Sequence, residues 1–129
     1  MKIQIRQTSV SGSEAAIRGH RVAVDRPVEK GGGDAGPMGG ELFLASIGGC
    51  FMSTLLAAIR ARELEISGVG VEVVAEPVGT PPRFEKVEVW VSAVAPDRGA
   101  LEKVVGIAAQ GCIMVNTLRD KIELEVGVV

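Results

Sequence analysis

The chain has 129 residues, 14 Lys and Arg against 16 Asp and Glu, a formal net charge of -2 and an isoelectric point near 5.5. This balance provides no positive surface for nucleic acid or for an anionic membrane, so we expect neither partner. The length fits a single domain, which we assign to residues 1–129. The first ten residues, MKIQIRQTSV, include no apolar stretch followed by a cleavage site. We therefore expect no secretory signal and a cytoplasmic protein.

Two strands and a glycine-rich loop are predicted before residue 41. Residues 2–6 and 17–25 alternate apolar and polar side chains, and turn residues lie between them at 11–13, which indicates an amino-terminal hairpin. Arg26-Pro27 ends the hairpin, because proline cannot donate a ladder hydrogen bond. The loop at 29–40, EKGGGDAGPMGG, lacks the Gly-Lys-Ser/Thr ending of a phosphate-binding loop, so we interpret it as a connector.

Residues 41–62, ELFLASIGGCFMSTLLAAIRAR, predict a long helix that is apolar on all sides. Its uncharged part, residues 42–59, is about as long as the shortest membrane span. Small and hydroxyl residues interrupt the run: Ser46, Gly48, Gly49, Ser53 and Thr54. Together with the strand patterns on both sides, they favour a buried core helix. Because such a helix must be covered all round, we expect a symmetric partner and hence a homodimer.

Two more strands follow this helix. Residues 69–73 and 87–93 alternate apolar and polar positions, with valine as the main apolar residue. The linker at 79–82, Gly-Thr-Pro-Pro, makes these runs a hairpin with a wide turn.

A second helix and a last strand complete the chain. After the N-cap residue Asp97, apolar residues recur at spacings of three and four up to Cys112, which places Cys112 on the buried face. A short helical turn at 113–119 leads to an alternating strand at 122–128. The order of elements predicts an α+β fold, with an antiparallel sheet packed on the long central helix and the second helix.

The two cysteines, Cys50 and Cys112, each follow glycine on a helix predicted to be buried. Glycine costs a helix about 1 kcal/mol relative to alanine, so another backbone or a ligand is expected to approach closely there. Spacing alone leaves two interpretations open. Both thiols are ordinary small hydrophobes, or one is oxidised to sulfenic acid and captured by the other as a disulfide, with a cation nearby. With only one histidine, His20, neither a zinc site nor a histidine-activated nucleophile is expected.

The segment GPMGGELFLASIGGC at 36–50, the apolar helix after it, GCIMVNTL at 111–118 and a closing strand together resemble the OsmC/Ohr family of thiol-dependent peroxide reductases. The resemblance extends from about His20 to the end of the chain. It implies an OsmC-like fold and an intertwined homodimer with two active sites at the subunit interface. It also implies a peroxidase that reduces organic hydroperoxides, and hydrogen peroxide more weakly. No cofactor is implied beyond an external reductant, which is a dithiol such as a lipoyl group or a small thiol.

The resemblance also implies roles for individual residues. Cys50 would be the peroxidatic residue that attacks the hydroperoxide, and Cys112 the resolving residue. Glu41 and one arginine of the amino-terminal hairpin would complete the catalytic set. Among the three arginines there, we prefer Arg18 to Arg21 and Arg26.

Two departures from the family pattern place this chain closer to the OsmC-like branch. Ile113 stands where the family usually has proline after the second cysteine. Glu41 lies nine residues before Cys50 rather than ten, which puts it on the opposite face of a straight helix. These departures motivate an alternative function, a non-enzymatic dimer that holds a small apolar molecule at the subunit interface.

Overall fold

The computed structural model describes residues 1–129, and the chain forms two compact units, Met1–Phe43 and Leu44–Val129. The long helix α1 (Gly39–Ala61) begins in the first unit and continues into the second. The prediction of one domain over residues 1–129 stays a prediction, because two compact units can belong to one domain or to two.

The first unit contains an antiparallel sheet of three strands in the order β1-β2-β3. Its elements are β1 (Gln4–Gln7), β2 (Ser13–Ile17), β3 (His20–Val24) and the short 3-10 helix η1 (Val28–Lys30). The predicted two-stranded hairpin is wrong, because β2 was missed. Ala15 and Ala16 give β2 no apolar-polar alternation, and its turn to β3 is only Arg18-Gly19, with Arg18 at a φ of 56°.

A buried carboxylate organises the glycine-rich loop after β3. Asp25 is 4 % exposed and accepts hydrogen bonds from the backbone N–H groups of Arg26, Gly33 and Ala35, at 2.7, 3.1 and 3.2 Å. These bonds lower the pKa of Asp25, so the carboxylate stays charged and the loop keeps its anchor at neutral pH. A Cβ at Gly32 would lie 1.9 Å from the Arg26 carbonyl oxygen, so the loop requires glycine there.

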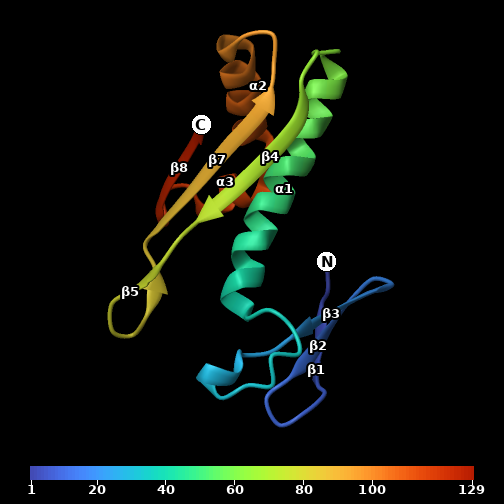
Figure 1. Cartoon of the computed structure of the whole chain (residues 1–129), viewed down its shortest axis with the longest axis vertical. Coiled ribbons are helices and arrows are strands. Elements are labelled where there is room, and N and C mark those ends of the chain that lie inside the picture. Colours follow the sequence, from blue (N-terminus) through green and yellow to red (C-terminus); the bar gives the residue numbers. More distant parts are fainter. The chain divides into compact units, whose positions relative to one another are not determined.

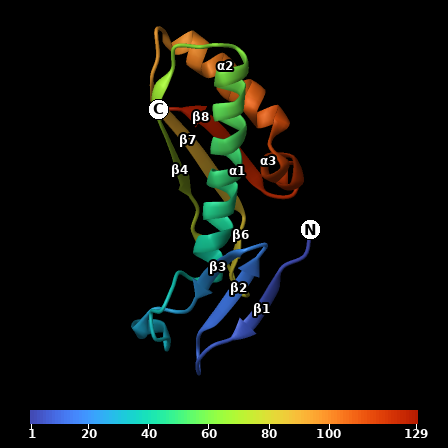
Figure 2. The same ribbon diagram turned by 90° about the vertical axis from the view of Figure 1, so that its right-hand side faces the viewer.

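The second unit has a main sheet with helices on one of its faces (Figures 1 and 2). After α1 its elements are β4 (Ser67–Val74), β5 (Pro77–Val78), β6 (Arg83–Phe84), β7 (Lys86–Val94), α2 (Arg98–Gly111), α3 (Ile113–Leu118) and β8 (Glu123–Val128). The predicted second helix begins as expected, because the Asp97 carboxylate accepts a hydrogen bond from Ala100 N at 2.7 Å. The wide turn between β4 and β7 includes the small β5-β6 pair.

The main sheet has the order β4-β7-β8 and is mixed rather than antiparallel. β4 and β7 pair antiparallel, as predicted, but β7 and β8 pair in parallel, with Val87 opposite Leu124 and Val89 opposite Val126. The connection between β7 and β8 explains their parallel pairing. α2 and α3 carry the chain back across the face of the sheet, so β8 starts at the same end as β7.

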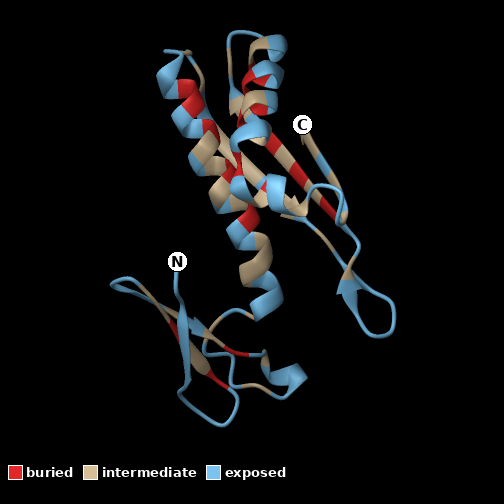
Figure 3. Ribbon diagram, turned by 180° about the vertical axis from the view of Figure 1, so that it is seen from behind, coloured by how far each residue is buried: buried red, intermediate tan, exposed pale blue.

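The core of the second unit lies between its helices and the sheet (Figure 3). The residues with no exposed surface come from three elements and their junctions: Ile47, Phe51 and Leu55 of α1; Val87, Val89 and Val91 of β7; Ala108 of α2; and Cys112 after it. Burying one large apolar side chain stabilises a fold by about 1.5–3 kcal/mol, so this cluster holds the unit together.

By length and composition alone, α1 is also long and apolar enough to cross a membrane. Its fully buried residues Ile47, Phe51 and Leu55 instead make it the core helix of the second unit. The other side of the helix stays open, with Leu56 48 % exposed. This exposure agrees with the expectation that a single chain cannot cover an apolar helix on all sides.

Candidate active site

The two thiols, 62 residues apart in sequence, lie side by side in the second unit. Cys112 Sγ is 3.5 Å from Cys50 Sγ and donates a hydrogen bond to it, and neither thiol is in a disulfide. A disulfide bond measures about 2.05 Å, so the two sulfur atoms are close enough to be joined after a small shift once an oxidant has taken up two electrons. Cys50 is partly exposed, whereas Cys112 has no exposed surface. A reagent from solvent therefore reaches Cys50 first.

Cys112 lies at the break between two helices. It follows the last residue of α2 and precedes α3, and its backbone is extended, with φ -79° and ψ 121°. Asn116 Nδ2 donates to the Gln110 carbonyl at 2.9 Å, which satisfies an unpaired acceptor at the end of α2. Because Cys112 is outside both helices, its side chain can shift without breaking the hydrogen bonds of α2.

The electrostatic surroundings keep Cys112 protonated. Burial raises the pKa of Cys112, and its hydrogen bond to Cys50 raises it further, although the backbone N–H groups of Val115 and Met114 act in the opposite direction. At neutral pH Cys112 is therefore a neutral thiol that donates its proton toward Cys50. The Cys50 sulfur atom accepts this hydrogen bond, and of the two residues only Cys50 keeps some exposed surface.

The two thiol-bearing segments pack against each other next to the cysteines. A Cβ at Gly111 would lie 3.4 Å from Thr54 Cγ2, so α1 and the end of α2 are close next to Cys112. Thr54 Oγ1 in turn donates to the Cys50 carbonyl at 3.0 Å. We expected a backbone or a ligand to lie close to the glycines before the cysteines. A Cβ at Gly49 would meet nothing within 4 Å, and the contact at Gly111 is an ordinary one to a side chain. Among these glycines only Gly48 is closely approached, because a Cβ there would lie 2.9 Å from Val73 Cγ2.

The remaining predicted site residues, Glu41 and the three arginines, belong to the first unit. Glu41 is in the first turn of α1, and its carboxylate accepts a hydrogen bond from Met38 N at 2.8 Å. This is the back-bond of a capping box, which gives Glu41 a structural role at the start of α1. Its catalytic role stays a prediction.

The three arginines differ in their surroundings. Arg18 is exposed at the tip of the β2-β3 turn, and Arg21 is paired with Glu14 at 2.9 Å. Arg26 donates its backbone N–H to Asp25 at 2.7 Å, but its guanidinium has no ion-pair partner. The choice of Arg18 as the catalytic cation also stays a prediction.

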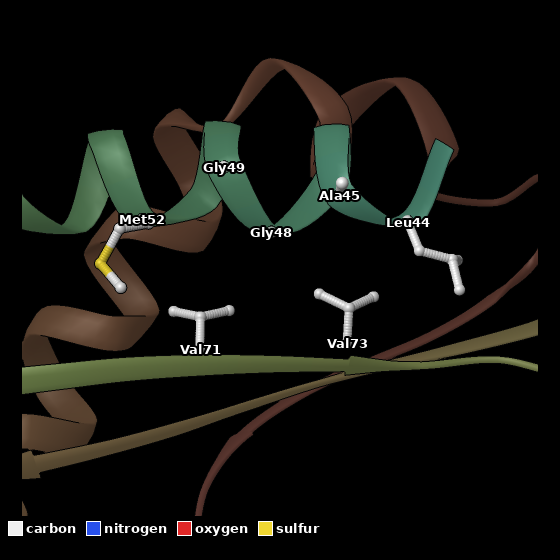
Figure 4. A pocket seen from close by; sticks show the side chains of 7 residues that line it. All are labelled: Leu44, Ala45, Gly48, Gly49, Met52, Val71 and Val73. Carbon is white, nitrogen blue, oxygen red and sulfur yellow. The ribbon is translucent and has the colours of Figure 1, made fainter. Parts of the chain in front are cut away.

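An apolar groove lies between α1 and β4 (Figure 4). It has a volume of about 440 Å³ and is lined by Leu44, Ala45, Gly48, Gly49, Met52, Val71 and Val73. Gly48 and Met52 are each two residues from Cys50, or about 200° around a helix, which turns them away from the thiol. A Cβ at Gly48 would lie 2.9 Å from Val73 Cγ2, so glycine there lets α1 approach β4. Sequence reasoning missed this groove, because it forms between segments that are distant in the chain.

The arrangement of two helices on one face of a sheet, with a paired dithiol between them, can be compared with known proteins. The sequence profile of the OsmC family, described as OsmC-like protein, matches residues 31–127. The chain belongs to the OsmC family. No curated protein is significantly similar to it in sequence.

Solved structures with the same fold extend over nearly the whole chain. The OsmC-like protein from Mycoplasma pneumoniae superposes with a TM-score of 0.87 at 15% identity, over 99% of this chain and 94% of that one. An organic hydroperoxide resistance protein OsmC from Legionella pneumophila gives 0.73 at 19%, over 98% and 94%. The organic hydroperoxide resistance protein OhrB of Bacillus subtilis gives 0.72 at 17%, over 99% and 96%. The predicted OsmC-like α+β fold is confirmed.

Proposed function

We propose that the protein is a thiol-dependent peroxidase that reduces organic hydroperoxides, and hydrogen peroxide more weakly, at Cys50. The observation that carries this proposal is the pairing of Cys50 with Cys112 at 3.5 Å, one thiol open to solvent and the other buried. The proposal is also supported by the family and by two relatives of the same fold that are described as organic hydroperoxide resistance proteins.

The first half of the proposed reaction takes place at Cys50. Its thiolate attacks one oxygen of the hydroperoxide, the O–O bond breaks, and the alkoxide leaves as alcohol after taking a proton. Cys50 is thereby oxidised to sulfenic acid. This step needs a cation that stabilises the thiolate and the developing negative charge on the leaving oxygen, and Arg18 stays our preferred candidate. Glu41 stays the fourth predicted member of the catalytic set.

The second half joins the two sulfur atoms. Cys112 loses its proton, attacks the Cys50 sulfenic acid and displaces hydroxide, which leaves as water when it takes up that proton. The protonated Cys112 found here is the state from which this step would start. An external dithiol such as a lipoyl group, or two equivalents of a small thiol, then reduces the disulfide. The sum is one hydroperoxide and two thiols converted to alcohol, water and one disulfide.

A thiol titration tests this function. One equivalent of cumene hydroperoxide per chain, added to reduced protein, is expected to remove two free thiols per chain, because Cys50 and Cys112 end in one disulfide. The thiols are counted with a chromogenic disulfide reagent in denaturant, before and after oxidation. Two remaining thiols after exposure to the peroxide would contradict the proposal. Reaction with dithiothreitol should restore both.

We also propose that the protein works as a homodimer. The open side of α1 carries Leu56 and a row of small residues, Ser46, Gly49, Ser53 and Ala57, all exposed in the single chain. Small side chains allow a second helix to approach closely. Sedimentation equilibrium is expected to give about twice the chain mass of 13.4 kDa. A mass of one chain at micromolar concentration would contradict this.

The apolar groove between α1 and β4 supports the second candidate, a non-enzymatic dimer that holds a small apolar molecule. The groove is large enough for such a ligand and does not include either thiol. The two functions differ in their dependence on Cys50, which the first needs and the second does not.

A further inference from the structure

The amino-terminal sheet is basic, although the chain as a whole is acidic. Residues 1–24 contain Lys2, Arg6, Arg18 and Arg21 but only one carboxylate, Glu14, which gives this segment a net charge of +3. The complete chain has a net charge of -2. The first three strands therefore form a positive surface. The proposed dithiol chemistry needs at most one of its cations.

Most of these charges converge on one face of the sheet. In the register of the strands, Gln4, Ala16 and Arg21 form one row across β1, β2 and β3, and Arg6 lies opposite Glu14 in the neighbouring row. Residues opposite each other in an antiparallel sheet share a face, as do residues two apart along a strand. Longer side chains thus surround the small Ala16.

The result is a polar hollow over the centre of the sheet. Its volume is about 400 Å³, and its lining is polar except for one residue: Gln4, Arg6, Gln7, Thr8, Glu14, Ala16 and Arg21. The two glutamines and the threonine can donate hydrogen bonds, and the two arginines each offer a planar fork of N–H groups. Glu14 contributes the one negative charge.

One of the two cations in this hollow, Arg6, has no ion-pair partner. Glu14 pairs with Arg21 at 2.9 Å, and the two side chains are 38 % and 70 % exposed, so the pair is weak and open to exchange. No ion pair includes Arg6, although it lies opposite Glu14. A guanidinium binds a carboxylate or a phosphate group through two parallel hydrogen bonds.

We propose that this hollow is a binding site for a small anionic molecule that carries a carboxylate or a phosphate group. Arg6 and Arg21 bind the anionic group from opposite sides of Ala16. Gln4 and Thr8 donate further hydrogen bonds to it. The site needs neither cysteine, so it is independent of the proposed peroxidase function.

Isothermal titration calorimetry tests the site with two probes, citrate for carboxylates and inorganic phosphate for phosphates, at low and constant ionic strength. At least one probe is expected to bind, and the probe that binds identifies the anionic group. The R6Q variant is expected to bind it about tenfold more weakly or worse, in line with the loss of a charged hydrogen bond. E14Q is expected to tighten binding at least about twofold, since it removes the repelling charge and releases Arg21.

The matched control is K30Q, which removes one positive charge from the same unit but from η1, outside the hollow. Its affinity is expected to stay within about twofold of the unaltered protein, because a charge outside the hollow acts through screened solvent. Equal weakening by K30Q and R6Q would overturn the proposal and indicate non-specific attraction. Failure of both probes to bind at millimolar concentration would also overturn it. Neither outcome bears on the thiols, because the readout is heat of binding and not peroxide turnover.

Discussion

A Cys50→Ser protein is expected to lose its hydroperoxide reductase activity by at least about a thousandfold, because the group that attacks the peroxide is gone. A Cys112→Ser protein is expected to keep the first step and lose the second. It should consume one equivalent of cumene hydroperoxide and stop with sulfenic acid on Cys50, since no thiol remains 3.5 Å away to capture it. Dimedone labelling with mass spectrometry identifies the cysteine that carries the sulfenic acid.

The two variants are matched controls for each other, because each replaces one sulfur atom by an oxygen atom and changes the side-chain volume little. Labelling of Cys112 in the Cys50→Ser protein would reverse the assigned roles. Full activity in the Cys50→Ser protein would exclude a peroxidase based on this dithiol. If that protein also retains an apolar ligand in the groove between α1 and β4, the non-enzymatic function is the better description.

Phe51→Ala is expected to lower the free energy of unfolding by about 3–5 kcal/mol. Phe51 is the largest side chain with no exposed surface, and it lies on α1 directly after Cys50, so truncation leaves a cavity among the buried residues of α1 and β7. Urea unfolding followed by circular dichroism measures the loss. The protein is kept reduced and at one fixed concentration, so that neither a disulfide nor association alters the comparison.

Val94→Ala is the control, because Val94 is 70 % exposed and its truncation opens no cavity. Its effect is expected to stay within about 1 kcal/mol, the span of strand propensities. A loss for Phe51→Ala no larger than that of the control would mean that α1 is not the core helix of this fold. Such a result would also remove the support that holds Cys50 against Cys112.

Much of the fold could be predicted from periodicity in the sequence. The unbroken apolar run gave the long core helix, the three-four spacing up to Cys112 gave α2, and Asp97 marked its start. Two features of the fold were predicted wrongly, for different reasons. Strand β2 has no alternation at Ala15 and Ala16, and the parallel pairing of β7 with β8 follows from how α2 and α3 pack, which no local pattern encodes.

The candidate site, like the fold, could be predicted only in part from the sequence. The sequence provided Cys50 and Cys112 as the thiols of interest, each with a glycine before it, but their separation of 3.5 Å is a property of packing. The structural role of Asp25 was not predicted. A lone carboxylate between a strand and a glycine-rich loop is a signal that could have identified it, because a loop short of partners for its backbone N–H groups needs an acceptor.

Residue types at short, regular spacings were enough to predict the family, the two thiols, the long apolar helix and the α+β class. The folded chain was needed to find that Cys112 is buried and protonated beside a more open Cys50, that Glu41 caps α1, and that Arg6 and Arg21 flank one hollow. These features could not be predicted because exposure, proton affinity and contacts between side chains depend on what packs around each group. That packing is set by segments far away in the chain.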